Sequence, residues 1–354
     1  MNPVVSSHRG WIEILTPKQV LFFRPLIETL RAGGFEILAT SRRYREVEQL
    51  SKMHGVDLTY VGERGGKDPK DQLAASIERE RQLLPIIEEF APDFSVSVAS
   101  ADCARISFGL SVPHYAVNDS PHSAIAGKLS LPLTRHLFTP WVIPHRAWAP
   151  FAIKRKQITR YRALDPAAWL KRIKMSSQPS SREKTIIVRL EESYAPYMKG
   201  KDLGWVDSIL RRIAKDFPDS KRIALCRYDD QLQHVKDMFG ASFEVPEEAV
   251  DGTSLLGRAS VFIGLGGTMT AEAALMGVPT ISAFQGNLYT EKYLISVGLL
   301  KKARTENAMA KLARSFLKPG VGKVFARRAS RVLTSMEDPI EIIARFLNTE
   351  HGHT

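Results

Sequence analysis

The chain has 354 residues, of which 44% are hydrophobic and 25% charged, and it carries two cysteines and a formal net charge of +12. This composition is that of an ordinary globular protein and excludes disordered, collagen-like and disulfide-scaffold classes. At roughly 150 residues per domain, the length indicates two domains. No window approaches the roughly 20 apolar residues of a membrane span, and the N-terminus lacks the apolar core of a signal peptide. We therefore expect a cytoplasmic protein, with Cys103 and Cys226 as small buried hydrophobes.

The positive charge is concentrated in two segments. Residues 146–174 carry nine Lys and Arg against one acid, and residues 301–331 carry ten against one, so the rest of the chain has a net charge of −5. A partner with phosphates, such as a nucleotide, a lipid head group or a nucleic acid, explains this pattern, and so does a pair of solvated helix faces. Aromatic residues are not interleaved with the basic ones, which disfavours nucleic acid. Peripheral contact with an anionic membrane is a further expectation.

Short apolar runs alternate with helical stretches in the first half of the chain. Strands are predicted, in chain order, at 11–15, 35–39, 57–61, 93–99 and 114–117, and helices at 20–31, 43–54, 72–90 and 102–110. Pro85 is expected to kink or split the third of these helices. Strands separated by helices favour βαβ units and a parallel sheet.

The second half restarts the same pattern. Strands are predicted at 185–190, 222–226, 242–245, 260–264 and 279–284, and helices at 203–216, 229–239 and 268–276, followed by a helical tail over 308–348 with breaks at 318–322 and 338–339. The Ser-rich segment 174–184 is the best linker. The predicted division is an N-terminal domain, a basic crossover with this linker, a C-terminal domain and a final helix, at 1–150, 151–184, 185–335 and 336–354. The fold class is α/β, with two Rossmann-like parallel-sheet domains facing across a cleft.

The most informative stretch runs from a predicted strand into a helix at residues 260–284. A Gly-rich turn at 264–267 includes Gly266 and Gly267, and Thr268 begins the helix. The glycines let a ligand approach the backbone, and the N–H groups and dipole of the helix start favour a diphosphate. Thr268 and Thr270 add hydroxyl donors, and Glu272 in the second turn is suited to accept hydrogen bonds from a ribose. A turn needed only for its geometry is the alternative.

The string GGTMTAEAALMGVP (266–279) resembles the nucleotide-sugar signature of GT-B-fold proteins. The resemblance implies that the loop and helix start hold the donor diphosphate and that Glu272 holds the ribose. Two such relatives are the lipid-linked N-acetylglucosaminyltransferase of cell-wall synthesis and the non-hydrolysing UDP-N-acetylglucosamine 2-epimerase. Nearly the whole chain is similar to an archaeal family known only as a domain of unknown function. That match is carried by residues 16–30, 118–123, 189–197, 226–231 and 250–256.

The chain departs from both relatives at the N-terminal domain. The transferases have a Gly-rich loop after the first strand, whereas this chain has Thr16-Pro17-Lys18-Gln19, closer to the short basic loop of the epimerase. The epimerase carries a catalytic glutamate a few residues beyond the proline that opens a late strand, and counting from Pro113 places Asn118 there. Asparagine cannot exchange protons, which argues against epimerisation. Asp119 takes that role only if the loop shifts by one residue.

Further candidates end strands of the C-terminal domain, at the edge where ligands bind in parallel sheets. Arg189 is placed to clamp a diphosphate, or to pair with Glu191 and Glu192. Arg227 and Tyr228 end the next strand and are candidates for contacts with the phosphate and the base.

The N-terminal domain offers a candidate general base. Asp119 and His122 are close enough to meet across a turn, and a carboxylate that orients an imidazole makes a base for an acceptor hydroxyl. The alternative is an Asx-turn and helix cap formed by Asp119 and Ser123, with His122 solvated. Lys18 and Gln19 begin the first helix and are candidates for binding an acceptor phosphate or sugar carboxylate.

Two carboxylates have helix-capping alternatives, and the histidines show no metal spacing. Asp102 either faces the ligand or caps the helix that follows, and Asp251 is favoured as a cap. His351 and His353 are expected in a disordered tail. No Asp-x-Asp pattern is present, so we expect no metal and no cofactor.

The sequence therefore favours a metal-independent glycosyltransferase of GT-B fold. By the resemblance its donor is a UDP-sugar. The sequence does not identify the acceptor, for which a lipid-linked molecule and a polysaccharide are the candidates. A nucleotide-sugar epimerase or hydrolase of the same fold is the first alternative. A non-catalytic nucleotide- or nucleic-acid-binding protein is the second.

Overall fold

The computed structural model describes residues 8–66, 68–173, 184–190 and 204–352. The chain divides into two compact units, Met1–Trp169 together with Glu337–Thr354, and Leu170–Met336. The first unit extends past the predicted boundary at residue 150, because a strand at Ile158–Tyr161 joins its sheet. The C-terminal helix also belongs to the first unit. The predicted linker 174–184 lies almost entirely outside the described residues.

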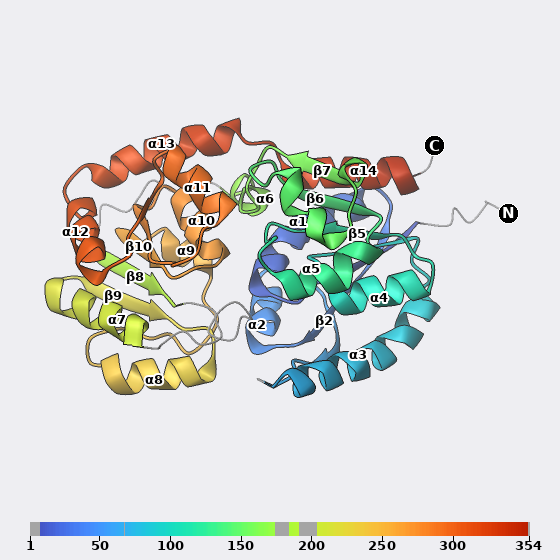
Figure 1. Cartoon of the computed structure of the whole chain (residues 1–354), viewed down its shortest axis with the longest axis horizontal. Helices are drawn as coiled ribbons and strands as arrows, with labels where there is room; N and C mark the ends of the chain where they lie inside the picture. Colours follow the sequence, from blue (N-terminus) through green and yellow to red (C-terminus); the bar gives the residue numbers. More distant parts are fainter. Residues whose placement is uncertain (1–7, 67, 174–183, 191–203, 353–354) are drawn as a thin grey trace. The chain divides into compact units, whose positions relative to one another are not determined.

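The first unit contains a parallel sheet of seven strands in the order β3-β2-β1-β4-β5-β6-β7 (Figure 1). The strands are β1 (Arg9–Glu13), β2 (Glu36–Arg43), β3 (Thr59–Glu63), β4 (Phe94–Ser97), β5 (His114–Val117), β6 (His136–Pro140) and β7 (Ile158–Tyr161). Its helices are α1 (Pro17–Ala32), α2 (Arg45–Met53), α3 (Pro69–Phe90), α4 (Ala101–Gly109), α5 (Ala124–Ser130) and α14 (Pro339–His351), and α6 (Ala167–Leu170) spans the boundary between the units. Short 3₁₀ turns lie at Leu131–Leu133, His145–Ala147, Ala149–Phe151 and Arg155–Gln157.

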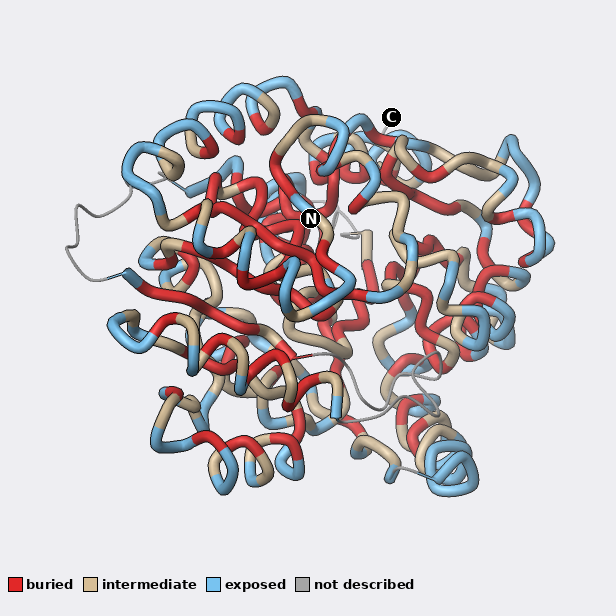
Figure 2. The backbone as a smooth tube through the Cα atoms, turned by 60° about the vertical axis from the view of Figure 1, so that its left-hand side comes forward, coloured by how far each residue is buried: buried red, intermediate tan, exposed pale blue. Residues whose placement is uncertain are grey.

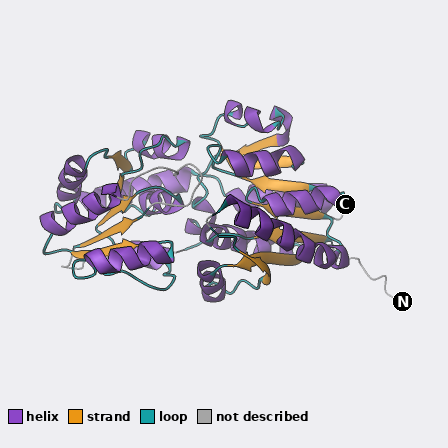
Figure 3. Cartoon of the chain, turned by 60° about the horizontal axis from the view of Figure 1, so that its bottom comes forward, coloured by secondary structure: helices purple, strands orange, loops and turns teal. Residues whose placement is uncertain are grey.

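Helices cover both faces of this sheet (Figure 3). Helix α1 contacts α2 and α14, and α4 contacts α3 and α5, which gives two separate helix layers. The central strands are buried, the edge strands β3 and β7 are partly exposed, and the helices expose their outer sides (Figure 2). Parallel strands buried on both faces read as continuous apolar runs, which is why the sequence pattern locates most of them.

The C-terminal helix α14 packs its aromatic side chains on the first sheet. Phe346 lies against Tyr115 and Phe138, with ring centroids 5.8 and 5.1 Å apart. His351 stacks on Phe94 at 4.9 Å, and its Nε2 lies 2.8 Å from the Tyr115 hydroxyl. The expectation of a disordered tail is therefore wrong for His351, because aromatic contacts hold the last turn of the helix. His353 lies outside the described residues.

The second unit contains a parallel sheet of five strands in the order β12-β11-β10-β8-β9. The strands are β8 (Thr185–Arg189), β9 (Lys221–Leu225), β10 (Val261–Gly264), β11 (Thr280–Ser282) and β12 (Leu300–Lys302). The helices are α7 (Gly204–Asp216), α8 (Asp229–Phe239), α9 (Gly252–Leu256), α10 (Thr268–Leu275), α11 (Tyr289–Ser296), α12 (Glu306–Phe316) and α13 (Val321–Ser335).

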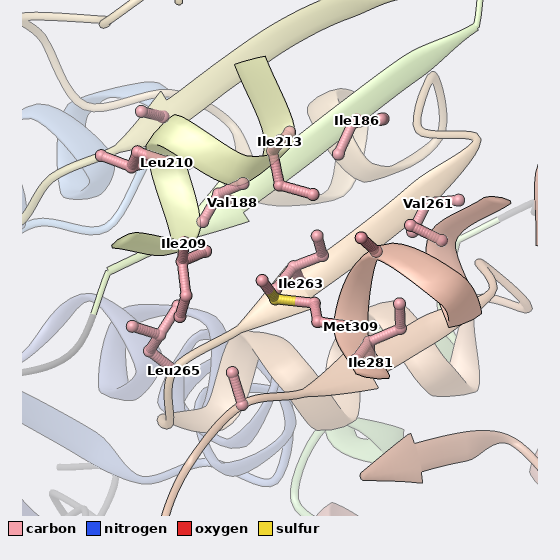
Figure 4. Close-up of a cluster of buried hydrophobic side chains, with 14 of the residues drawn as sticks. Ile186, Val188, Ile209, Leu210, Ile213, Val261, Ile263, Leu265, Ile281 and Met309 are labelled. Carbon is pink, nitrogen blue, oxygen red and sulfur yellow. The ribbon is translucent and has the colours of Figure 1, made fainter. Parts of the chain in front are cut away.

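The core of the second unit has two sides. On one side, apolar residues of β8 and β10 pack against α7, α8 and α12 (Figure 4). On the other side, Phe262 and Ile187 pack against α9 and α10 through Leu256 and Ala273. The sheet is thus held between two helix layers, and its strand ends stay in register at one edge.

Cap residues explain where several helices begin. Asp68 accepts a hydrogen bond from the Lys70 N–H at the start of α3, and Asp338 accepts one from the Ile340 N–H at the start of α14. A proline follows each of these aspartates, where its missing N–H leaves no donor unsatisfied. The predicted Asp251 cap is confirmed, since its carboxylate accepts from the Thr253 N–H at 3.1 Å.

Several expected elements differ from those observed. The predicted strand 242–245 is wrong: only Glu244 pairs there, in an isolated bridge with Ile223, and Pro246 then ends the pairing. Helix α3 runs through Pro85 as one element, so of the predicted kink or split the split is wrong. Strands β6, β7 and β12 were not predicted. They are short, and two of them lie in or beside basic segments.

Cys103 is buried as expected, but Cys226 is only partly buried.

Glycine at position 277 is required by its conformation and by the close approach of a second helix. Gly277 has a φ of +80°, and a Cβ there would lie 2.5 Å from the Ala326 Cα on α13. Gly320 has a similar φ of +83°, but an added Cβ would meet nothing within 4 Å. We expect Gly320→Ala to lower the unfolding free energy by about 1 kcal/mol and Gly277→Ala by about 1–3 kcal/mol more. Urea unfolding followed by circular dichroism measures the difference. Equal losses would show that the helix contact contributes nothing.

Candidate functional site

The Gly-rich turn of the second unit lies at the carboxyl end of β10. Gly264 pairs with Arg189 of β8, and the Leu265 N–H donates to the Arg189 carbonyl at 3.0 Å. Gly266 and Gly267 then adopt φ values of +127° and +82°, which favour glycine. A Cβ on Gly267 would meet nothing within 4 Å, so the backbone is open at the start of α10.

Threonine side chains flank this turn in two different ways. Thr268 begins α10 and is partly exposed. The N–H groups of a first helical turn have no intrahelical partner and attract anions. Thr270, in contrast, is buried, and its hydroxyl lies 3.4 Å from the Gly266 carbonyl, to which it donates. Thr270 thus braces the turn from inside, and Thr268 is the residue at its open side.

Glu272 lies one turn into α10, and its side chain is almost completely buried. Its Oε1 accepts a hydrogen bond from the Thr253 hydroxyl of α9 at 3.0 Å. A Cβ on Gly252 would lie 3.8 Å from Oε2, so this oxygen points toward the start of α9. The short helix α9, capped by Asp251, therefore fixes the carboxylate beside the Gly-rich turn.

Arg189, Arg227 and Tyr228 lie at the ends of neighbouring strands, as expected. The Arg189 guanidinium donates through Nη1 to the Cys226 carbonyl at 2.9 Å. The Arg227 guanidinium lies 6.0 Å from the centroid of the Tyr228 ring. Tyr228 is itself buried at the start of α8. Its ring is therefore part of the packing in this unit, which makes it less suited to stack on a base. Glu191 and Glu192 lie outside the described residues.

In the first unit, Lys18 is held between two carboxylates. Its Nζ lies 2.7 Å from Asp119 Oδ2 and 2.6 Å from Asp165 Oδ2. Asp165 is 1% exposed and also accepts a hydrogen bond from the Tyr161 hydroxyl at 2.6 Å. The start of α1, the loop after β5 and the segment after β7 thus meet at one ammonium group.

The two carboxylates differ in their affinity for a proton. Burial raises the pKa of Asp165 to about 6 against the attraction of Lys18, and the Asp119 charge adds to this rise. Burial acts on Asp119 in the same direction, but Lys18 and the Ser120 hydroxyl hold the pKa of Asp119 below its usual range. Asp119 therefore stays ionised, and Asp165 is the member of the pair that takes a proton first.

His122 follows Asp119 in the same loop and is exposed. Partial desolvation lowers its pKa against the attraction of Asp119, and the Lys18 charge adds to the lowering. The imidazole is therefore neutral at pH 7, as a general base must be. The Asx-turn is formed by Asn118, whose Oδ1 accepts from the Ser120 N–H at 2.7 Å. The alternative of an Asx-turn at Asp119 with a Ser123 cap is wrong, because the Asp119 carboxylate contacts Lys18 and Ser123 forms no side-chain cap hydrogen bond.

Gln19 and Asp102 have partners within the first unit. Gln19 Oε1 accepts from the Leu15 N–H at 2.5 Å, so its side chain closes the turn between β1 and α1. Ser100 caps α4, and the capping alternative for Asp102 is wrong. The Asp102 carboxylate instead binds Arg79 of α3, with Nη1 2.8 Å from Oδ2.

Sequence reasoning did not identify Asp165, Tyr161, Arg79 or Glu13. Asp165 is the one acid in the first basic segment, and Glu13 is an acid inside the apolar run of β1. An acid in such a setting indicates a paired charge, and this signal was available in the sequence. Its partners were not, because they come from distant parts of the chain.

The basic segments lie on the surface. Every described Lys and Arg in 146–174 and 301–331 is exposed except Lys302, which is partly buried. On α13, Lys323, Arg327 and Arg331 follow one another at four-residue spacing along one side of the helix. This exposure is compatible with solvated helix faces and with an anionic partner.

The described residues contain neither a membrane-spanning helix nor a metal-ligating cluster. No helix in the described part of the chain combines the length and apolar character needed to cross a bilayer. Across those same residues, no three His, Cys, Asp or Glu side chains are grouped so that they could hold a metal ion.

Solved structures define the class of protein. A putative UDP-N-acetylglucosamine 2-epimerase from Listeria monocytogenes matches with a TM-score of 0.75 and 12% identity, covering 99% of this chain and 98% of that one. The UDP-GlcNAc 2-epimerase of Neisseria meningitidis bound to UDP-GlcNAc matches with a TM-score of 0.65 and 13% identity, over 96% and 100%. The spinosyn forosaminyltransferase matches with a TM-score of 0.62 and 16% identity, over 97% and 99%. The chain therefore has the GT-B fold that epimerases and glycosyltransferases share.

The chain belongs to the family described as protein of unknown function (DUF354), whose model matches residues 9–349. The uncharacterized protein MJ0665 of Methanocaldococcus jannaschii is 28% identical over 301 residues, which cover 80% of this chain and 84% of that protein. The resemblance to an archaeal family and the GT-B fold class are both confirmed.

The raised pKa of Asp165 predicts a pH dependence of stability. The folded protein binds more protons than the unfolded chain between the ordinary pKa of aspartate, near 4, and the folded value of about 6. In this window Asp165 contributes a fall in unfolding free energy with rising pH, of up to about 1.4 kcal/mol per pH unit. Its contribution is fully present below pH 4 and lost as the pH rises through 6.

Asp165→Asn should remove this slope, since asparagine does not titrate. Urea unfolding of both proteins at several pH values between 4 and 6 measures it. Glu248→Gln serves as control, because Glu248 is exposed and has no partner in the described part of the chain. Parallel pH profiles for wild type and Asp165→Asn would contradict the assignment.

Proposed function

We propose that this chain is a metal-independent glycosyltransferase that uses a nucleotide-diphosphate sugar, with a UDP-sugar as the first candidate donor. The observation that carries the proposal is the open turn at Gly266 and Gly267 before α10, with the Glu272 carboxylate fixed one turn later. Helix N-termini bind phosphates, and a buried carboxylate accepts hydrogen bonds from vicinal hydroxyls. UDP-GlcNAc is bound by one protein of the same fold, the Neisseria epimerase.

The diphosphate and the ribose of the donor are proposed to bind at successive positions along this turn. The diphosphate binds at the backbone N–H groups of Gly267 and Thr268, and the ribose binds at Glu272. Arg189 reinforces the diphosphate site, since it ends β8 beside Gly264 and a guanidinium matches the geometry of phosphate oxygens. As the bond to the sugar breaks, negative charge develops on the leaving diphosphate, and the helix dipole and Arg189 stabilise it.

The acceptor is proposed to bind to the first unit, with His122 as general base. His122 is neutral at pH 7 because its pKa is lowered, and Asp119 stabilises the imidazolium through its charge after proton transfer. Lys18 has a positioning role in this scheme. It keeps Asp119 ionised and directs the carboxylate, while its own charge is compensated by Asp119 and Asp165.

Epimerisation or hydrolysis of a nucleotide-sugar is the second candidate function. It is supported by the epimerases among the structures of the same fold. Against it stands Asn118, which is buried and engaged in the turn to Ser120. Incubation with a nucleotide-sugar alone separates the two, because an epimerase or hydrolase converts it without any acceptor.

Nucleotide binding is tested first by thermal unfolding with UDP, GDP, ADP, CMP and TDP. A ligand at about 100 times its Kd raises the unfolding free energy by about 2.7 kcal/mol. We expect UDP to raise Tm and Glu272→Gln to lose most of this shift. Glu248→Gln, with the same change in charge at an exposed position of the second unit, should keep it. If no nucleotide raises Tm at millimolar concentration, the Gly-rich turn has only a structural role.

His122→Gln tests the base once a donor and an acceptor are known. We expect kcat to fall by about 10²–10⁴ with the donor Kd unchanged, because only proton removal is lost. In the wild type, activity should decline on the acid side only below pH 6.5, where the imidazole becomes protonated. His8→Gln changes a histidine before β1, at the amino end of the same sheet, and should keep full activity. A normal kcat for His122→Gln would exclude His122 as the base.

A further inference from the structure

A second group of charges is buried at the carboxyl ends of β1, β2 and β3. Arg79 of α3 is 1% exposed, and its Nη2 lies 2.6 Å from Glu13 Oε1. Its Nη1 lies 2.8 Å from Asp102 Oδ2, and its Nε donates to the Val61 carbonyl at 3.0 Å. Asp102 also accepts from the Ser76 hydroxyl at 2.5 Å. The charge of Arg79 is therefore paired with two carboxylates.

Arg42 lies beside this group, where the attraction of Asp102 and Glu13 does not offset burial and the repulsion of neighbouring arginines. It stands on β2, where the register with β3 shifts between Ser41 and Arg43. Such irregularities re-aim a side chain. The Nε atom of Arg42 is buried without a hydrogen-bond partner, and the Arg42 side chain forms no ion pair in the described part of the chain. Burial lowers its pKa, and repulsion from Arg64 and Arg79 lowers it further.

Glu13 has a buried acceptor atom without a donor, whereas Arg42 has a buried donor atom without an acceptor. Its side chain is 0% exposed, and Oε1 lies against Arg79. Its Oε2 is buried without a hydrogen-bond donor among the described residues. A buried polar atom left in this state costs free energy, and such atoms in a folded protein indicate a role beyond stability. The group thus presents one donor atom, Arg42 Nε, and one acceptor atom, Glu13 Oε2, that are buried without a hydrogen-bond partner among the described residues.

The balance of charge in this group is positive. Arg42, Arg64 and Arg79 stand against the carboxylates of Glu13 and Asp102. The Arg64 guanidinium is held over the Tyr44 ring at 5.3 Å from its centroid, just beyond the end of β2. An anion is the partner that such a group requires, and guanidinium groups bind phosphate oxygens through paired N–H donors.

We propose that the carboxyl ends of β1–β3 bind a hydroxylated organic phosphate. Arg42, with Arg64, binds the phosphate oxygens, and Glu13 Oε2 accepts a hydrogen bond from a hydroxyl of the same molecule. The place suits a ligand, because parallel α/β sheets bind ligands beyond their carboxyl ends. The binding site stands on its own observations. That its ligand is the sugar acceptor rests on the proposed function.

Binding is tested by isothermal titration with glycerol 3-phosphate, methyl phosphate and inorganic phosphate, and with glycerol alone. We expect glycerol 3-phosphate to bind more tightly than either other phosphate, because only it carries hydroxyls for Glu13. Glycerol should not bind detectably. Equal affinity for all three phosphates would overturn the role of Glu13, and no binding by any of them would overturn the site.

Arg42→Gln and Arg43→Gln form a matched pair, since they remove the same charge from adjacent residues of β2. Arg43 is exposed, so its variant should bind as the wild type does. Arg42→Gln should lower the affinity for glycerol 3-phosphate by a factor of at least about ten. It should not lower Tm without ligand, because it removes a buried cation that forms no ion pair in the described part of the chain. A loss of Tm with unchanged affinity would show that Arg42 is structural.

Two further variants keep the outcome clear. Arg42→Lys keeps the charge but not the paired donors, and should bind with intermediate affinity. Glu272→Gln, in the other unit, should leave glycerol 3-phosphate binding unchanged. Failure of the nucleotide site is thereby separated from failure of this one. If Glu272→Gln abolished both UDP and glycerol 3-phosphate binding, the independent site proposed here would be wrong.

Discussion

The ammonium of Lys18 ties together three parts of the first unit that are distant in sequence. It begins α1, and it meets Asp119 after β5 and Asp165 after β7. A buried charge is tolerated only when it is paired, so these three segments must come together before the lysine can leave water. Arg79 does the same for β1, β3 and α4. The ion pairs of Lys18 and of Arg79 both lie at the carboxyl ends of the strands. They fix the loops there, which apolar packing alone does not hold in place.

The second unit shapes its own strand ends by a different means. At the turn formed by Gly266 and Gly267 the backbone adopts positive φ values that favour glycine, so side chains do not cover it. The bracing there comes from short neutral or singly charged contacts, such as Thr253 to Glu272. One unit thus offers fixed side-chain charges, and the other offers backbone dipoles. The donor diphosphate and the hydroxylated acceptor that we propose make these two different demands.

The parts of the site that could be predicted from sequence are those whose residues all lie within one short stretch of the chain. The turn before α10, with Glu272 following, is a local pattern whose chemistry depends on helix geometry, and the apolar runs mark most strands. Asp165, Tyr161 and Arg79 could not be assigned, because their roles depend on partners brought from other strands. The same limit explains the misplaced Asx-turn: the choice between Asn118 and Asp119 depends on Lys18, about a hundred residues earlier. It also explains His351, whose order depends on Phe94 and Tyr115.

The return of α14 to the first sheet affects how the chain is made. The first unit is interrupted after Trp169 and resumes at Glu337, where the Glu337 N–H donates to the Arg162 carbonyl. At a synthesis rate of about 5–20 residues per second, the sheet emerges from the ribosome roughly ten to thirty seconds before the helix that covers it. During that time Phe94, Tyr115 and Phe138 lack the aromatic contacts of α14. The second unit can finish folding first, although the first unit is translated earlier, and a nascent chain stalled in between would present this aromatic face to chaperones.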